Sequence, residues 1–146
     1  TESFVDEEEY IVRVPEGLIH LHVLQEPMSC AAKAVEQAYE AQRRMKVWRP
    51  QLAYVLGSGQ IGLLTTLALK LRGLDVYTLA RGEAPNLKAE IVEGLEATYV
   101  STRQKSMSDL VAETGKPALI IDATEAMEHS GHYGGVVWTG ITGGDR

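Results

Sequence analysis

The chain has 146 residues, of which 45% are hydrophobic, and this composition is enough for one compact domain with its own core. Its formal net charge of −6 argues against general nucleic-acid binding, because such proteins usually carry a basic stripe. No apolar run is long enough to cross a bilayer and the acidic N-terminus is unlike a signal peptide, so we expect a soluble, cytoplasmic protein with no membrane partner. The single cysteine, Cys30, excludes an internal disulfide and a zinc site made of cysteines alone.

The first predicted elements are a strand and a long helix. Residues 9–14, EYIVRV, are rich in strand-forming side chains, and Pro15 and Gly17 end the run. A helix is predicted over residues 29–42, with one apolar face made of Ala31, Ala34, Val35, Ala38 and Tyr39. Cys30, beside this face, is expected to be a small buried residue.

A glycine-rich turn follows the next strand. The apolar run 52–56 leads straight into the sequence GSGQIG, and an amphipathic helix leaves it and stops at Gly73. Gly57 permits a tight turn, Gly59 lets the backbone approach phosphates, and Gly62 lets the helix pack close to the strand. The turn is therefore predicted to hold a dinucleotide pyrophosphate on the helix N-terminus, although the bare pattern also suits a turn without a ligand. The residues predicted to hold it are Gly57, Ser58, Gly59, Gln60, Ile61 and Gly62.

The end of the second strand is expected to lie beside the adenosine ribose. This strand, residues 75–79, continues into Ala80 and Arg81 about twenty residues after the glycine motif. An NAD-selective site usually has an acidic residue there, whereas a guanidinium offers several donors to a 2′-phosphate. The sequence thus favours NADP over NAD. Gly82 adds no second positive charge, Glu83 would repel a phosphate if it pointed inward, and the simpler alternative for Arg81 is an ordinary solvated side chain.

Helices and strands alternate over the rest of the chain. Helices are predicted around residues 86–94, 106–113 and 124–129, and strands at 97–100, 118–122 and 136–138. This alternation predicts an α/β fold, a doubly wound parallel sheet of the Rossmann type. Ligands of such sheets lie at the carboxyl ends of the strands, where the segment 101–103 is expected near the adenine end. Further cofactor contacts are predicted for Thr102, Ala123, Thr124, Thr139, Gly140 and Ile141, each of which is otherwise an ordinary polar or small residue at a strand end.

Four segments in this order carry a family resemblance: EYIVRVP at 9–15, EPMS at 26–29, the glycine motif, and ATYVSTRQ at 97–104. Together they resemble the zinc-dependent medium-chain dehydrogenases, and within them the microbial glucose 1-dehydrogenase branch. The resemblance implies that residues 1–27 are the tail of a GroES-like catalytic domain and that 28–146 form an NAD(P)-binding Rossmann domain. It also implies oxidation of an aldose at C1 to its lactone, with hydride passing to NADP or NAD and zinc acting as a Lewis acid.

The resemblance implies one zinc ligand in this chain. Glu26 matches the family's late carboxylate or amide position, whereas the family's earlier cysteine and histidine have no match here; without them Glu26 would be a surface residue. The pairs His20 with His22 and His129 with His132 lack the supporting spacing of a zinc site, so structural or solvent roles are expected for them.

Two departures from the family pattern modify these expectations. The segment between Thr124 and Gly134 is shorter than in the family, so the chain is expected to be an incomplete coenzyme domain of a longer enzyme, unable by itself to oxidise a sugar. Cys30 stands near a position where parts of the branch use a polar sugar contact, which weakens glucose as the specific substrate. A zinc-dependent polyol or secondary-alcohol dehydrogenase and a non-catalytic nucleotide-sensing module are the alternatives. The resemblance also implies a homo-oligomer.

Overall fold

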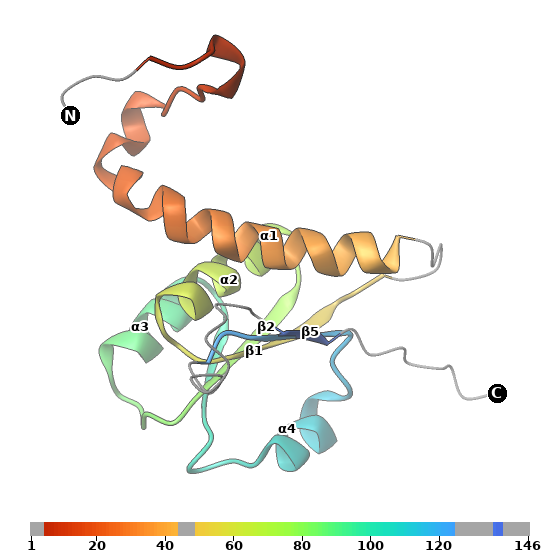
Figure 1. The fold of residues 1–146 in the computed structure, drawn as a ribbon. Coiled ribbons are helices and arrows are strands. Elements are labelled where there is room, and N and C mark those ends of the chain that lie inside the picture. Colours follow the sequence, from red (N-terminus) through yellow and green to blue (C-terminus); the bar gives the residue numbers. More distant parts are fainter. Residues whose placement is uncertain (1–4, 44–48, 125–135, 139–146) are drawn as a thin grey trace, which may run out of the picture.

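A five-stranded sheet forms the centre of the fold (Figure 1). The computed structural model describes residues 5–43, 49–124 and 136–138, the last three by their backbone alone. The strand order is β3-β2-β1-β4-β5, and the first four of these strands are parallel. The predicted α/β, Rossmann-type sheet is therefore confirmed. The parallel strands are β1 (Leu52–Leu56), β2 (Asp75–Ala80), β3 (Thr98–Ser101) and β4 (Leu119–Asp122).

The direction of β5 (Val136–Trp138) differs from the prediction. This strand pairs antiparallel with β4, with Ile121 opposite Val137. A parallel return needs a crossover of about a dozen or more residues, usually including a helix, and the connection from Asp122 to Val136 is close to that minimum. The helix predicted at 124–129 lies outside the described residues except for Thr124, which belongs to the loop after β4.

Helices cover the two faces of the sheet unequally. Helices α1 (Gln25–Gln42), α2 (Gln60–Leu71) and α3 (Leu87–Gly94) pack on one face, and α4 (Met107–Thr114) packs on the other (Figure 1). Side chains alternate between these faces along each strand. The first face has a core that includes Val35, Ala53, Val55, Leu69, Val76, Val92, Leu119 and Ile121, and the second has Tyr54, Leu79, Val100 and Leu110.

The helix ends follow local sequence signals. Side chains of Asn86 and Ser106 accept hydrogen bonds from the first turns of α3 and α4, at 3.0 and 3.1 Å. Gly73 ends α2 with a φ of +80°. Helix α1 begins four residues before the prediction because Pro27 falls in its first turn, where the missing N–H costs nothing. None of the described helices is long and apolar enough to cross a membrane.

The strand predicted at 9–14 is wrong. Residues Glu8–Tyr10 form a short 3-10 helix, Ile11 is extended, and Glu16–Leu24 form a second 3-10 helix that leads into α1. An extended segment needs a neighbouring strand for its backbone groups, and none of the described residues supplies one. Figure 1 shows this segment, in red and orange, projecting from the α/β unit. Most of its large apolar side chains are exposed: Val5, Tyr10, Ile11, Val12, Leu18, Ile19, Leu21 and Val23.

A buried hydroxyl pair joins α2 to β2. The Thr66 hydroxyl donates to the carbonyl of Gly62 at 2.9 Å and lies 2.8 Å from the Thr78 hydroxyl. We expect Thr66→Val to lower the free energy of unfolding by about 1–3 kcal/mol, because it removes the side-chain partner of a fully buried hydroxyl. Chemical denaturation measures this change.

A double-mutant cycle distinguishes the loss of this hydroxyl contact from a general effect on packing. The Thr66→Val/Thr78→Val double variant is expected to lose less than the sum of the two single variants, since the contact can be lost only once. Strict additivity would contradict the coupling. The exposed Thr98→Val is the matched control, expected to stay within about 0.5 kcal/mol of the parent.

Candidate nucleotide-binding site

The carboxyl ends of the central strands are joined by backbone hydrogen bonds from the loops that follow them. The N–H of Gly57, after β1, donates to the carbonyl of Leu79 on β2 at 2.7 Å. The N–H of Ala123, after β4, donates to the carbonyl of Leu56 on β1 at 2.8 Å. The strand order reverses between β1 and β4. These loops therefore border the crevice in which open α/β sheets bind their ligands.

The three glycines of the motif meet different surroundings. Gly57 has a φ of +101°, and a Cβ there would lie 2.9 Å from the carbonyl oxygen of Ala123. A Cβ on Gly62 would lie 2.0 Å from the carbonyl oxygen of Gly57, whereas a Cβ on Gly59 would meet no atom within 4 Å. The geometry agrees with the turn role predicted for Gly57 and the packing role predicted for Gly62. Gly59 faces open space, as close approach of a ligand requires.

Helix α2 starts inside this motif without a side-chain cap. Its N-cap is Gly59, whereas α3 and α4 are both capped by side chains. The first N–H groups of a helix have no partner within the helix and carry partial positive charge. In α2 these groups are left available to an anion. Around them Ser58 is buried, Ile61 is half-buried and Gln60 is exposed.

The loop after β4 is held by an aspartate that the prediction did not assign. The Asp122 carboxylate accepts hydrogen bonds from the backbone N–H of Thr124 at 2.9 Å and from its hydroxyl at 2.6 Å. The Thr124 methyl group lies 3.3 Å from where a Cβ on Gly57 would be. Ala123 and Thr124 thus adjoin the glycine turn. In the sequence, the signal for this turn is an aspartate two positions before a threonine, because an aspartate side chain can accept a hydrogen bond from the backbone two residues later.

The ends of β2 and β3 form the other side of the site. Thr102 donates to the carbonyl of Ala80 through its backbone N–H at 2.8 Å and through its hydroxyl at 3.3 Å. The Tyr99 hydroxyl donates to the carbonyl of Gly82 at 3.0 Å, a contact that no local sequence pattern indicates. Arg81 is exposed between these contacts. Among the described residues it forms no side-chain hydrogen bond or ion pair.

A hollow of about 310 Å³ between β3 and α4 is a different site. Tyr77, Thr98 and Leu110 line it, as does the ion pair between Lys105 and Glu113. It opens on the face of the sheet opposite α2. Ser101, from the segment expected near the adenine end, borders it, whereas the other predicted cofactor residues do not. The hydrogen bond that Lys105 donates to the Glu113 carboxylate raises the pKa of Lys105 above its usual value, which keeps this lysine charged and paired.

The candidate metal ligand stands apart from other donors. Glu26 is exposed in the first turn of α1. Within the described part of the chain, no three His, Cys, Asp or Glu side chains come together in a way that could hold a metal ion. His20 and His22 are exposed, and the His22 ring donates to the carbonyl of Ile19 at 2.6 Å.

The prediction that Cys30 is buried is wrong, and several other predicted residues lie outside the described part of the chain. Cys30 is exposed rather than buried, because the buried face of α1 runs through Ala31, Val35 and Ala38, and Cys30 precedes that face by one position. The predicted contacts Thr139, Gly140 and Ile141 lie outside the described residues, as do His129 and His132.

Comparisons with known proteins agree on one group of relatives. A family model described as "Glucose dehydrogenase C-terminus" matches residues 19–144. Glucose 1-dehydrogenase 1 of Caldivirga maquilingensis is 37% identical over 134 residues, which are 89% of this chain and 38% of the relative. The chain therefore spans well under half the length of that relative.

Two solved structures that resemble this chain are a glucose dehydrogenase and, at lower identity, a butanediol dehydrogenase. Haloferax mediterranei glucose dehydrogenase, in complex with NADP, Zn and gluconolactone, superposes with a TM-score of 0.72 at 37% identity, covering 86% of this chain and 36% of that one. The 2R,3R-butanediol dehydrogenase from Bacillus subtilis superposes with a TM-score of 0.59 at 26% identity, covering 77% and 31%.

Proposed function

Because this chain belongs to the glucose dehydrogenase C-terminus family, we propose that it is the cofactor-binding part of an NADP-preferring, zinc-dependent dehydrogenase that oxidises an aldose at C1 to its lactone. The Haloferax mediterranei relative, solved with NADP, Zn and gluconolactone, supports this choice of cofactor and product. The observation that carries the proposal is the uncapped N-terminus of α2, which lies beside an open glycine at the strand-order reversal.

The described residues fit a dinucleotide. We assign the pyrophosphate to the N–H groups at the start of α2, where Gly59 leaves space for close approach. We assign Arg81 as a hydrogen-bond donor to the 2′-phosphate, and the turn at Ala123 and Thr124 as the part that closes the crevice beside the glycines. Bound NADP would accept the hydride that leaves C1 of the sugar. The part of the chain described here contributes binding and orientation to that reaction.

We propose that Glu26 is the zinc ligand that the described part of the chain contributes. A carboxylate is a suitable zinc ligand at about 2 Å, and the first turn of α1 leaves that of Glu26 exposed. One carboxylate does not make a zinc site, and no described donor group completes one. The remaining ligands and the proton acceptor are therefore assigned to the full-length protein outside the described residues.

The division at residue 27 follows from the same proposal. Residues 1–27 are proposed to be the tail of a GroES-like catalytic domain, and 28–146 the Rossmann domain. The exposed apolar side chains of the projecting segment 5–24 support this division, because apolar side chains gathered on one exposed segment usually mark a contact with another part of the protein.

Arg81→Ala tests the cofactor assignment. We expect the variant of the full-length protein to bind NADPH about 10-fold or more weakly with little change for NADH, because a charge-assisted hydrogen bond to the 2′-phosphate is lost. Fluorescence titration with both nucleotides measures the difference. Arg43→Ala is the matched control, since Arg43 pairs with Glu40 at the far end of α1. Equal weakening of both nucleotides would rule out Arg81 as a 2′-phosphate contact.

A polyol or secondary-alcohol dehydrogenase is the second candidate. The superposition on 2R,3R-butanediol dehydrogenase favours it, and the exposed thiol of Cys30 lies one helical turn after Glu26, where a sugar-specific site would benefit from a stronger hydrogen-bonding group. The lower identity, 26% against 37%, places it second. Comparing aldoses with vicinal diols as substrates of the full-length protein separates the two.

A further inference from the structure

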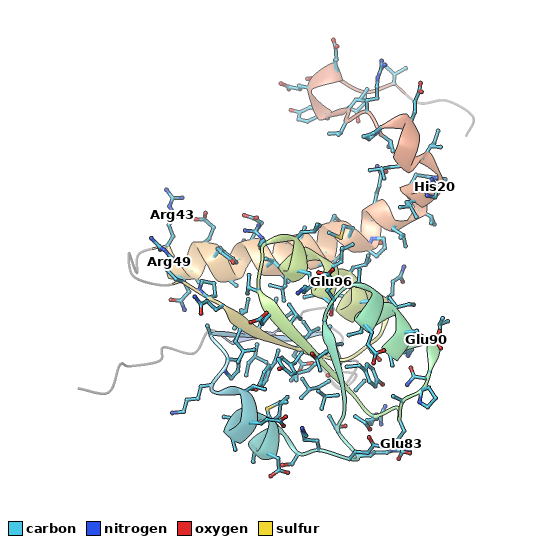
Figure 2. The ribbon with its side chains drawn as sticks, turned by 180° about the vertical axis from the view of Figure 1, so that it is seen from behind. His20, Arg43, Arg49, Glu83, Glu90 and Glu96 are labelled. Atoms are coloured by element: carbon cyan, nitrogen blue, oxygen red, sulfur yellow. The ribbon has the colours of Figure 1, made fainter. Side chains whose placement is uncertain are left out.

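The loop that follows β2 offers a phosphate only one positive side chain. Arg81 is followed by Gly82, which has no side chain, and then by the acidic Glu83. A phosphate monoester carries a charge of about −1.5 to −2 at neutral pH, and proteins usually bind such groups with more than one charge-assisted hydrogen bond. Figure 2 shows Glu83 at the tip of this loop, at the opposite end of the molecule from Arg43. A second cation near Arg81 would have to come from another element.

The turn after β3 supplies such a group. Ala80 and Ser101 are paired in the register of β2 and β3. Thr102 then donates twice to the carbonyl of Ala80, through its N–H at 2.8 Å and its hydroxyl at 3.3 Å. Arg81 directly follows Ala80, and Arg103 directly follows Thr102. The two hydrogen bonds between Thr102 and Ala80 therefore hold the backbones of the two arginines near each other.

A second contact holds these segments together from the other side. The Tyr99 hydroxyl donates to the carbonyl of Gly82 at 3.0 Å, and a Cβ on Gly82 would lie only 3.1 Å from that hydroxyl oxygen. The backbone on both sides of Arg81 is thus bound to β3 or to the turn after it. This leaves the spacing of the two arginine backbones little freedom.

The positive charges of Arg81 and Arg103 are available to a bound anion. Both side chains are exposed, and neither has a hydrogen bond or ion pair with another described residue. Three other cations of the described chain are already paired: Arg43 with Glu40, Arg72 with Glu36 and Lys105 with Glu113. Two unpaired guanidinium groups at adjacent strand ends repel each other, and an anion between them would remove that repulsion.

We propose that Arg103 is a second specificity-determining residue for the 2′-phosphate of NADP and acts together with Arg81. This inference rests on the proposed function, since it requires a nucleotide at the carboxyl ends of β1 and β2. Gly82, the residue directly after Arg81, has no side chain that could carry a second positive charge, and Arg103 would supply that charge instead.

Titration of the full-length protein with NADPH, NADH and adenosine 2′,5′-bisphosphate tests the proposal. Arg103→Ala and the uncharged, similarly long Arg103→Gln are both expected to weaken NADPH and the bisphosphate by about 10-fold or more and to leave NADH within about 2-fold. Arg103→Lys is expected to restore part of the affinity, because it keeps the charge but loses the forked donors. Arg43→Ala is the control for removal of a surface arginine, and thermal melting checks that each variant is folded.

The outcomes separate this inference from the function on which it rests. If Arg81→Ala weakens NADPH selectively while both Arg103 variants bind like the parent, Arg103 has no part in recognition and the proposed function stands. Equal weakening of NADPH and NADH by the Arg103 variants would also overturn the inference, since it indicates a general effect on the loop. If the parent protein binds none of the three nucleotides, the proposed function and the inference both fail.

Discussion

Alanine in place of Gly62 is expected to destabilise the domain by about 3 kcal/mol or more, which is at the upper end of the range for overpacked sites. The new Cβ would lie 2.0 Å from the carbonyl oxygen of Gly57 and 2.8 Å from its carbonyl carbon. Both atoms belong to the backbone of a tight turn, so no flexible side chain can move aside. The start of α2 would have to move away from β1, and nucleotide binding should be lost with it. Denaturation followed by circular dichroism measures the stability.

Gly94→Ala is the matched control for this substitution. Gly94 is also a helical glycine, at the end of α3, but a Cβ there would meet no atom within 4 Å and its φ is not positive. Alanine at this position is expected to be neutral or slightly stabilising, because glycine loses more conformational freedom on folding. If Gly62→Ala unfolds at the same denaturant concentration as Gly94→Ala, the close packing of α2 against the turn is contradicted.

Gly59→Ala is expected to have the opposite combination of effects: a stable fold and a loss of nucleotide binding. Gly59 has φ and ψ of −74° and −176°, which alanine adopts without strain, and its Cβ would enter open space. In the proposed complex that space lies against the pyrophosphate. The added methyl group should weaken NADPH binding by about 10-fold or more, or about 1.4 kcal/mol and above, while the denaturation midpoint stays close to that of the parent.

The nucleotide dependence distinguishes this effect from that of Arg81. Because NADPH and NADH share the pyrophosphate, Gly59→Ala is expected to weaken both by the same factor, whereas Arg81→Ala discriminates between them. Parent-like affinity of Gly59→Ala for both nucleotides would place the pyrophosphate elsewhere. Titrations of the two variants side by side therefore locate two different parts of the cofactor.

The elements between residues 52 and 122 are the part of the fold that the sequence predicts well. Buried parallel strands are short apolar runs, and the helices between them begin and end at local signals such as Asn86, Ser106 and Gly73. Predicted and observed boundaries here differ by at most one residue, except at the start of α2, which begins within the glycine motif. These signals are read within a few residues, so no knowledge of the rest of the fold is needed.

The predictions that were wrong depend on partners distant in the sequence. The strand at 9–14 requires a neighbouring strand, the direction of β5 depends on the path of its connection, and the burial of Cys30 depends on how α1 is rotated against the sheet. The site shows the same division. The glycine turn is a local pattern, whereas the contact from Tyr99 to Gly82 spans seventeen positions and becomes visible only when β2 and β3 are side by side.

The hydrogen bonds that join the strand ends also bear on the thermodynamics of binding. The loops after β1, β3 and β4 are each anchored to the last carbonyl groups of a neighbouring strand, through Gly57, Thr102 and Ala123. Their conformational entropy is therefore lost when the domain folds, and little remains to be lost when a ligand arrives. The crevice is therefore pre-organised, and the proposed nucleotide would bind to donors whose positions are already fixed.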